Sequence, residues 1–203
     1  MKSKAKFIYL ISPNKINSNF FTILKELLKT KKVAYFQLRL KKTPPNKIVK
    51  ISKKIKKICK IYKVKFIIND DPIIAKKVNA DGCHLGQTDI CINEARKIIK
   101  NKIIGITCHN SLEMSKKAIK SGADYVAIGA FNYSKTKRIK YKATLKDLIN
   151  IRKISTKPIV AIGGINHKNY KKLLLNKADF LAISSFIWKN KKLKPIDAIN
   201  KLK

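Results

Sequence analysis

Short apolar runs alternate with amphipathic segments along almost the whole chain, and this alternation predicts the secondary structure. The runs are mostly continuous, which is typical of strands that are buried on both faces of a parallel sheet. The predicted strands are KFIYLIS (6–12), AYFQLRL (34–40), KFIIND (65–70), GCHLG (82–86), KIIGIT (102–107), YVAIGAF (125–131), PIVAIGG (158–164) and FLAISSF (180–186).

The segments between these runs carry apolar residues at the spacing of a helix. In residues 46–63, Ile48, Ile51 and Ile55 recur at intervals of three and four, which indicates one buried face with lysines around the rest. Further helices are predicted at 19–31, 111–122 and 169–177.

The order of the elements predicts the fold. Eight strand-like runs, each followed by a helix or a helical turn, fit a closed (β/α)8 TIM barrel. A chain of 203 residues is near the lower limit for that fold, so we expect short loops and a single domain that spans residues 1–203. A doubly wound open sheet is the structural alternative.

The charge first points elsewhere, because a formal net charge of +37 suggests nucleic acid or an anionic membrane as a partner. The lysines, however, are spread over all helix-like segments and form no single stripe, so we interpret them as a solvated basic surface. No segment has the roughly 20 apolar residues of a membrane span, and the four cysteines form no C-x-x-C pair. We therefore expect a cytoplasmic protein without a nucleic-acid or membrane partner, and we leave association into a homo-oligomer open.

Polar residues collect where the predicted strands end. Since TIM barrels build their active sites at the C-terminal ends of the strands, these residues are the candidates for function. They follow seven consecutive predicted strands, as Gln37, Arg39 and Lys41; Asn69, Asp70 and Asp71; Gln87 and Asp89; Thr107 and His109; residues 132–137; Gly163 and Gly164; and Ser184 and Ser185.

Two acids among these residues suggest a metal site. Neighbouring parallel strands lie about 4.8 Å apart, so Asp70 and Asp89 at adjacent strand ends can share one cation. Magnesium takes one or two carboxylates together with substrate phosphates and waters. In so basic a chain, acids at this place are best explained by Mg²⁺.

The remaining residue types describe a ligand with phosphate groups. Arg39, Lys41 and Lys137 are cations from different strand ends, as needed to hold phosphate oxygens. The glycine pair 163–164 and the serine pair 184–185 can offer backbone N–H groups to a second phosphate. We therefore predict two phosphorylated ligands, one of them a metal-bound diphosphate.

These residues, in this order, resemble the thiamine phosphate synthase family. The matching blocks, which extend from about residue 7 to residue 188, are QLRLK (37–41), IIND (67–70), ADGCHLGQTD (80–89), IIGITCHNSLEMSKKAIKSGADYVAIGAF (103–131), SKTK (134–137) and AIGGI (161–165). Any single block is a weak signal, whereas their combination is specific. The resemblance implies a transferase that joins an aminopyrimidine methyl diphosphate to a carboxylated thiazole phosphate, with release of pyrophosphate and CO₂.

The resemblance also implies a role for each matching position. Arg39, Lys41 and Lys137 would act on the departing diphosphate, and Asp70 and Asp89 would hold Mg²⁺. The pyrimidine diphosphate would be bound by Gln37, Arg39, Lys41, Asn69, Thr107 and Lys137, and the thiazole phosphate by Ser134, Lys135, Thr136, Gly164, Ser184 and Ser185.

Some positions depart from the family pattern and keep alternatives open. Ala130 replaces a frequent proline, and the stretches 138–147 and 176–180 lack usual glycines, which concerns the thiazole side. A related thiazole tautomerase branch carries a histidine at the place of Ala130 and tends to lose the acids that remain here as Asp70 and Asp89. A non-catalytic barrel that binds nucleic acid or another polyanion is a further alternative, although carboxylates at its mouth would repel phosphate.

Several nearby residues have a simpler structural interpretation. Asp71 is more typical of a helix cap than of a metal ligand, because a proline follows it. His84 lies inside a predicted strand and suits a hydrogen-bonded interior residue, and His109 suits the start of a helix. Asp124 and Asp179 precede strands, at the opposite face of the barrel, where residues serve stability.

Overall fold

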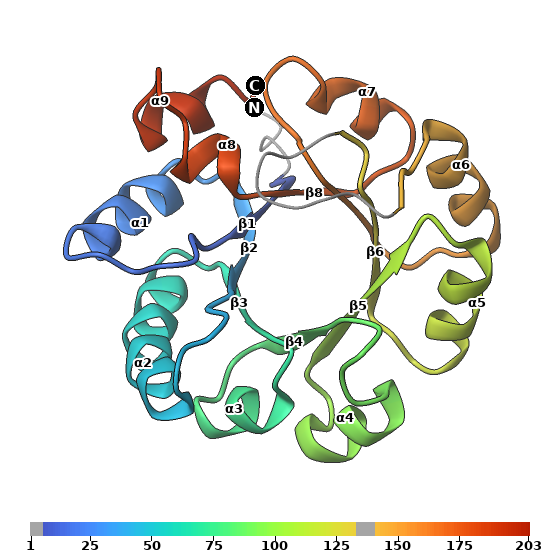
Figure 1. Cartoon of the computed structure of the whole chain (residues 1–203), viewed down its shortest axis with the longest axis horizontal. Helices are drawn as coiled ribbons and strands as arrows, with labels where there is room; N and C mark the ends of the chain where they lie inside the picture. Colours follow the sequence, from blue (N-terminus) through green and yellow to red (C-terminus); the bar gives the residue numbers. More distant parts are fainter. Residues whose placement is uncertain (1–5, 133–140) are drawn as a thin grey trace.

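The computed structural model describes residues 6–132 and 141–203 and shows a closed barrel of parallel strands (Figure 1). The strands follow one another around the ring in chain order, and the last pairs with the first, Ile8 opposite Leu181. Their bounds are β1 Ile8–Ile11, β2 Val33–Leu38, β3 Lys65–Asn69, β4 Gly82–Leu85, β5 Ile103–His109, β6 Tyr125–Gly129, β7 Ile159–Ile162 and β8 Phe180–Ile183. The predicted (β/α)8 barrel is confirmed, and the open sheet is wrong because the ring has no edge strand.

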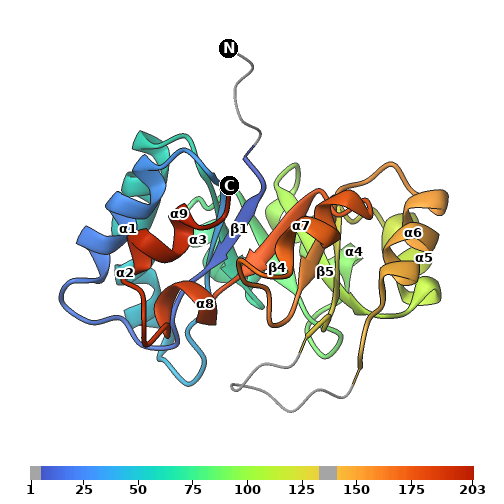
Figure 2. The ribbon, with the colours of Figure 1, turned by 90° about the horizontal axis from the view of Figure 1, so that it is seen from above.

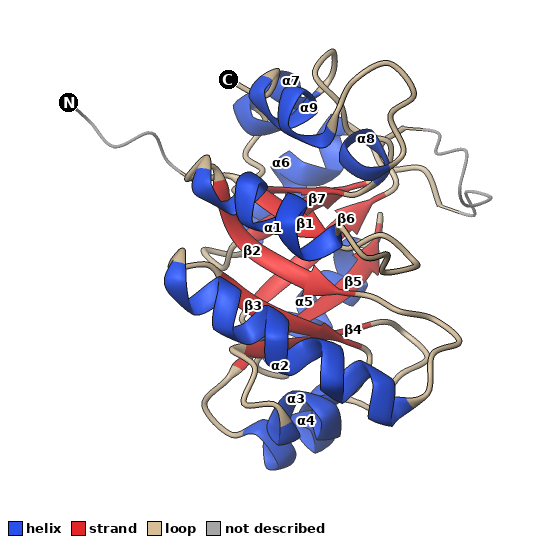
Figure 3. Ribbon diagram, turned by 90° about the vertical axis from the view of Figure 1, so that its left-hand side faces the viewer, coloured by secondary structure: helices blue, strands red, loops and turns tan. Residues whose placement is uncertain are grey.

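Helices form an outer layer around the strands, as the end-on view in Figure 1 and the side view in Figure 3 show. In the described part of the chain they are α1 Phe20–Lys29, α2 Pro45–Ile61, α3 Pro72–Lys77, α4 Ile92–Ile99, α5 Leu112–Lys120, α6 Leu145–Ile154, α7 Tyr170–Leu175, α8 Ser185–Trp188 and α9 Pro195–Asn200. None of them combines the length and the hydrophobicity that a membrane-spanning helix requires.

The end of the last strand differs from the prediction. β8 stops at Ile183, whereas the apolar run predicted a strand to residue 186. The carbonyl of Ser184 accepts hydrogen bonds from the N–H groups of Ile187 and Trp188, both at 3.0 Å, which begins the single helical turn α8. The indole N–H of Trp188 then donates to the carbonyl of Ile11 at 2.7 Å and ties this turn to the end of β1.

The apolar interior has two parts. One lies between the strands and the outer helices and contains most of the buried aliphatic residues. The other lies inside the barrel, where Tyr9, Ile67, Tyr125 and Val160 pack together. The rings of Tyr9 and Tyr35 stack there at a centroid distance of 5.3 Å, so tyrosines fill a space that aliphatic residues fill in most barrels.

Acidic residues at the N-terminal face of the barrel have structural partners. The Asp124 carboxylate accepts the N–H of Ile104 at the start of β5 and binds the guanidinium of Arg96 from α4, both at 2.8 Å. The same arrangement recurs at Asp81 with the Phe66 N–H and Lys56, and at Asp179 with the Ile159 N–H and Arg152. The structural interpretation of Asp124 and Asp179 is therefore confirmed.

The C-terminus lies at this same end of the barrel (Figure 2). The carbonyl of Lys203 accepts a hydrogen bond from the hydroxyl of Tyr170 in α7 at 2.6 Å, and its N–H donates back to that hydroxyl at 3.0 Å. These two hydrogen bonds hold the C-terminal residue at the end of the barrel opposite the candidate site.

Candidate active site

The sequence-predicted site residues lie at the C-terminal ends of the strands wherever the structure describes them. Gln37, Asn69 and Thr107 belong to β2, β3 and β5 themselves. Ser185 is the first residue of α8, and the others occupy the loops or turns that follow a strand, namely Arg39, Lys41, Asp70, Asp89, Gly164 and Ser184. Ser134, Lys135, Thr136 and Lys137 lie outside the described residues.

Asp70 and Asp89 come together from neighbouring strand ends. Burial, the charge of Asp89 and a hydrogen bond between the two carboxyl groups raise the pKa of Asp70 to about 6. The cations Lys41 and Arg39 are close enough to act in the opposite direction, with Lys41 the stronger. The two acids therefore face each other, with positive charge beside them, in an arrangement whose repulsion a bound cation would relieve.

Backbone contacts fix both acids. Asp70 adopts a left-handed conformation with φ of 66°, and its N–H donates to the carbonyl of His84 in β4 at 2.7 Å. Aspartate is one of the few residues that tolerate this conformation. Asp89 Oδ2 accepts the N–H of Gly86 at 2.6 Å, which closes the turn after β4 around the carboxylate. Both side chains are thus placed by the strands that precede them.

Asp71 has a different task from its neighbour. Its side chain accepts the N–H of Ile74 at 2.8 Å, and it is the N-cap of α3. A capping oxygen of this kind satisfies one of the free N–H groups at the start of a helix. The interpretation of Asp71 as a helix cap is confirmed.

An amide pair lies beside the acids on β2 and β3. Gln37 is 3% exposed, and its Nε2 donates to Oδ1 of Asn69 at 2.6 Å. This bond leaves the side-chain oxygen of Gln37 as an acceptor and the side-chain nitrogen of Asn69 as a donor. The pair can therefore offer one acceptor and one donor to a flat heterocycle.

Ser12, which the sequence reasoning missed, links two parts of the site. Its hydroxyl accepts the N–H of Arg39 at 2.9 Å, and its carbonyl accepts the hydroxyl of Ser184 at 3.2 Å. Ser12 is 2% exposed and follows β1 directly. Ser12 is the polar last residue of the first predicted strand, 6–12, and that polar strand end was the signal that could have identified it.

His84 connects the interior of the barrel to the site. Its Nδ1 lies 2.8 Å from the hydroxyl of Tyr125, and its Nε2 lies 2.9 Å from the hydroxyl of Thr107. Burial lowers the pKa of His84 to about 4, so the imidazole is neutral at pH 7. The interpretation of His84 as a hydrogen-bonded interior residue is confirmed, but its contact with the predicted site residue Thr107 was not foreseen.

His109 is not at a helix start, and that interpretation is wrong. It is the last residue of β5, has φ of 53°, and stacks on Tyr141 at a centroid distance of 4.3 Å. Helix α5 begins later because Ser111 provides its cap, with the Ser111 hydroxyl accepting the N–H of Met114 at 3.1 Å. The strand extends farther than its apolar run.

The turn after β7 is built from two glycines in left-handed conformations. Gly163 has φ of 106°, and a Cβ on it would come within 2.5 Å of the Ala130 side chain. Gly164 has φ of 57°, and its carbonyl accepts the side-chain amides of Asn169 at 3.0 Å and Asn166 at 3.4 Å. Only glycine fits at position 163, so the turn can pass close to the end of β6.

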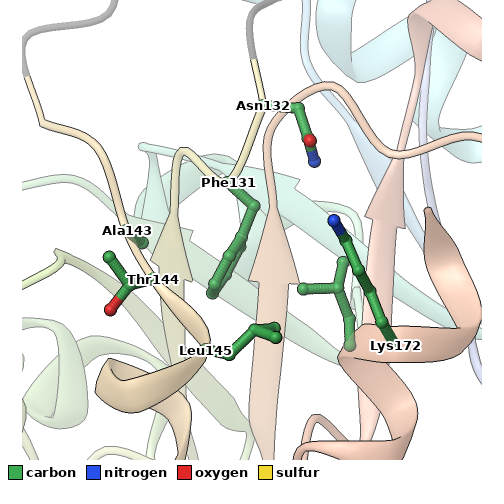
Figure 4. Close-up of a pocket in the computed structure, with 7 residues that line it drawn as sticks. Phe131, Asn132, Ala143, Thr144, Leu145 and Lys172 are labelled. Atoms are coloured by element: carbon green, nitrogen blue, oxygen red, sulfur yellow. The ribbon is translucent and has the colours of Figure 1, made fainter.

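A pocket of about 160 Å³ lies outside the barrel ring, between the start of α6 and α7 (Figure 4). Figure 4 shows the side chains of Asn132 and Lys172 pointing toward one another across it. Its lining residues are Phe131, Asn132, Ala143, Thr144, Leu145, Lys172 and Leu173. Of these residues, only Asn132 belongs to the stretch 132–137 that the sequence predicted as functional.

Comparison with known proteins identifies the family. A sequence model described as thiamine monophosphate synthase matches residues 8–187, which is most of the chain. The chain belongs to the thiamine monophosphate synthase family.

Individual relatives match between about three quarters and all of the chain. The chain is 64% identical over 204 residues to a thiamine-phosphate synthase of Pelagibacter ubique, covering 100% of this chain and 98% of that protein. It is 44% identical over 152 residues to a thiamine-phosphate synthase of Saccharophagus degradans, covering 74% of this chain and 70% of the relative. A solved structure of a thiamine phosphate pyrophosphorylase from Pyrococcus furiosus superposes with a TM-score of 0.85 at 29% identity, covering 97% of this chain and 93% of that chain.

The donor set of this family member fits the magnesium that the resemblance implies. Asp70 and Asp89 supply two carboxylates, the number that Mg²⁺ commonly takes from protein. Within residues 6–132 and 141–203 no three or more His, Cys, Asp or Glu side chains form a ready metal cluster. The remaining ligands would therefore be phosphate and water oxygens, as in other sites where Mg²⁺ arrives with its substrate.

Proposed function

We propose that this protein is a magnesium-dependent thiamine-phosphate synthase. It joins an aminopyrimidine methyl diphosphate to a carboxylated thiazole phosphate and gives thiamine phosphate, pyrophosphate and CO₂. Membership of the family makes it a transferase of thiamine biosynthesis. The observation that carries the metal and diphosphate part is the facing pair Asp70 and Asp89, with Lys41 and Arg39 beside it.

The charges of the site suit a reaction in which a diphosphate leaves. Arg39, Lys41 and Lys137 would hold the departing phosphate oxygens, and a bound Mg²⁺ would supply neutralisation of their charge. No protein nucleophile is needed, because the carbon–oxygen bond breaks before the thiazole nitrogen attacks. Catalysis then depends on alignment of the two reactants and on charge stabilisation.

The two ligands would occupy different sides of the barrel mouth. Gln37, Asn69 and Thr107 would bind the pyrimidine, since the pair on β2 and β3 offers an acceptor and a donor. The thiazole phosphate would bind at Ser134, Lys135, Thr136, Gly164, Ser184 and Ser185. The left-handed glycine turn and the hydrogen bond from Ser184 to Ser12 support this side of the proposal.

The same proposal places the reaction in the cytoplasm, with these small molecules as the partners. Cys59, Cys83 and Cys108 are free, buried thiols, and a reducing compartment would keep them so.

A coupling assay tests the function. Purified protein is mixed with both substrates and Mg²⁺, and thiamine phosphate and pyrophosphate are followed by chromatography with and without a chelator. We expect both products to appear in equal amounts and to disappear with the chelator. Folded protein that yields no product would refute the synthase reaction, and product that persists with the chelator would refute the metal dependence.

A further inference from the structure

Four side chains form a continuous hydrogen-bonded chain through the interior of the barrel. The Tyr9 hydroxyl in β1 lies 2.7 Å from the Tyr125 hydroxyl in β6. The Tyr125 hydroxyl contacts Nδ1 of His84 in β4 at 2.8 Å, and Nε2 of His84 contacts the Thr107 hydroxyl in β5 at 2.9 Å. Tyr9 and Tyr125 are almost fully buried, whereas Thr107 is partly exposed at the mouth. This series of hydrogen bonds therefore connects the apolar interior of the barrel to its mouth, where the candidate site lies.

The protons of the His84 imidazole decide the direction of these hydrogen bonds. A ring nitrogen that carries a proton donates, and a ring nitrogen without one accepts. Both neighbours of the imidazole are hydroxyl groups, which can do either. Whether Nδ1 carries a proton therefore decides the direction along Tyr125 and Tyr9.

The two possible directions differ at the buried end. If Nδ1 carries the proton, His84 donates to Tyr125, Tyr125 donates to Tyr9, and the Tyr9 proton needs another acceptor. Tyr9 is 1% exposed and sits among apolar residues such as Ile67 and Ala182. Among the described residues, its hydroxyl has no hydrogen-bond partner other than Tyr125. This direction leaves a buried donor without a partner, which is costly.

The opposite direction satisfies every buried proton. Tyr9 donates to Tyr125, Tyr125 donates to Nδ1 of His84, and Nε2–H donates to the Thr107 oxygen. The Thr107 proton is then the one left over, at the partly exposed end where a ligand can accept it. We propose that His84, held by Tyr125 and Tyr9, is a positioning residue that orients the Thr107 hydroxyl as a hydrogen-bond donor to the bound substrate.

The ligand class follows from this direction. Thr107 would require an acceptor atom, such as a ring nitrogen or a phosphate oxygen, and would disfavour a ligand that presents an N–H group there. The backbone of Thr107 is held as well, because the side-chain amide of Gln87 donates to its carbonyl. The identity of the acceptor as part of the pyrimidine diphosphate rests on the proposed function, whereas the direction of the chain does not.

The first test reads the imidazole proton directly. Long-range proton–nitrogen correlation spectra of the full chain with ¹⁵N-labelled histidine distinguish the two tautomers. The chain contains three histidines, and His84 is identified by the signal that disappears in His84→Gln. We expect the Nε2–H tautomer at pH 7 in the absence of any ligand. An Nδ1–H tautomer or a charged imidazolium would overturn the proposal, whether or not the protein is a synthase.

The second test asks whether Tyr125 acts through Thr107. We expect Tyr125→Phe to lower kcat/KM for the pyrimidine diphosphate about tenfold, Thr107→Val to lower it at least as much, and the double variant to equal Thr107→Val alone. Thr107→Ser, which keeps the hydroxyl, should lower kcat/KM less than Thr107→Val does. Tyr35→Phe is the matched control, since Tyr35 stacks on Tyr9 in the same cluster and the described hydrogen bonds do not include it.

The outcomes separate the possibilities. Losses that add in the double variant, or an equal loss in Tyr35→Phe, would show that Tyr125 acts on packing alone and would overturn the proposal. If the wild-type protein has no synthase activity, the same comparison is made with the dissociation constant of the pyrimidine diphosphate measured by calorimetry. Failure of the proposed function and failure of this inference are therefore distinguishable.

Discussion

The two ends of the barrel treat their acidic residues in opposite ways. At the N-terminal end, Asp81, Asp124 and Asp179 each bind a cation from a helix and a backbone N–H of a strand. At the C-terminal end, Asp70 and Asp89 face each other, and the pKa of Asp70 is raised by burial and by its acidic neighbour. Acids that are paired with a cation of the chain stabilise the fold. Two acids that repel each other are typical of a site where a bound ligand relieves the repulsion.

The comparison also explains why so basic a chain keeps these few acids. The chain has eleven acidic residues and 48 basic ones. Five of the acids are the three at the N-terminal end and the two at the C-terminal end of the barrel. The three at the N-terminal end anchor strand starts to α2, α4 and α6, every second helix of the outer layer. A general basic surface therefore surrounds a small number of acids with defined places.

Removal of an acid at the mouth should produce the largest change. We expect Asp89→Asn to lower kcat/KM at least about a hundredfold, since the variant would lose a proposed metal ligand and the charge stabilisation that the metal would supply. The midpoint of thermal unfolding without metal should stay unchanged or rise, because Asp70 loses a like-charged neighbour.

Steady-state kinetics and a thermal melt of the same preparation check both parts. Asp197→Asn is the matched control. Asp197 is an exposed acid in the first turn of α9 and belongs neither to the three acids at the N-terminal end nor to the facing pair at the mouth. Near-normal activity of folded Asp89→Asn would contradict the assignment of the metal site.

The reciprocal change at the N-terminal end should affect stability instead. Asp124→Ala leaves the Ile104 N–H without its acceptor and removes the carboxylate partner of the Arg96 guanidinium, which keeps only backbone carbonyls as acceptors. We expect a loss of about 1–3 kcal/mol in the free energy of unfolding, with an unchanged kcat. Denaturant titration gives the free energy of unfolding. A kcat that falls together with it would contradict a purely structural role of Asp124.

Ligand binding should give the most direct contrast between the two ends. Pyrophosphate with Mg²⁺ should raise the midpoint of thermal unfolding of the wild type, since a ligand at 100 times its dissociation constant stabilises by about 2.7 kcal/mol. The rise should be retained in Asp124→Ala and absent in Asp89→Asn. A rise produced equally by pyrophosphate alone would contradict a shared metal site.

The sequence by itself determined the architecture and the end of the barrel at which the candidate site residues lie. Continuous apolar runs separated by amphipathic segments specify buried parallel strands with covering helices, and these are local patterns that need no knowledge of the ring. The polar residues after each run, such as Asn69 and Asp70, follow from the same pattern, because all parallel strands end at one face. The cap at Asp71 is local as well.

Only the tertiary structure decided which of these residues touch. Tyr9 and Tyr125 are 116 positions apart, and Ser12 and Ser184 are 172 apart, yet each pair shares a hydrogen bond. The turn after β8 also has a distant partner, because the indole N–H of Trp188 donates to the Ile11 carbonyl. Such contacts are set by closure of the ring and by the register between strands, which fix side chains from remote segments at one level of the barrel. A local sequence pattern places a residue on a strand, whereas closure of the ring and the register between strands determine which distant side chain it contacts.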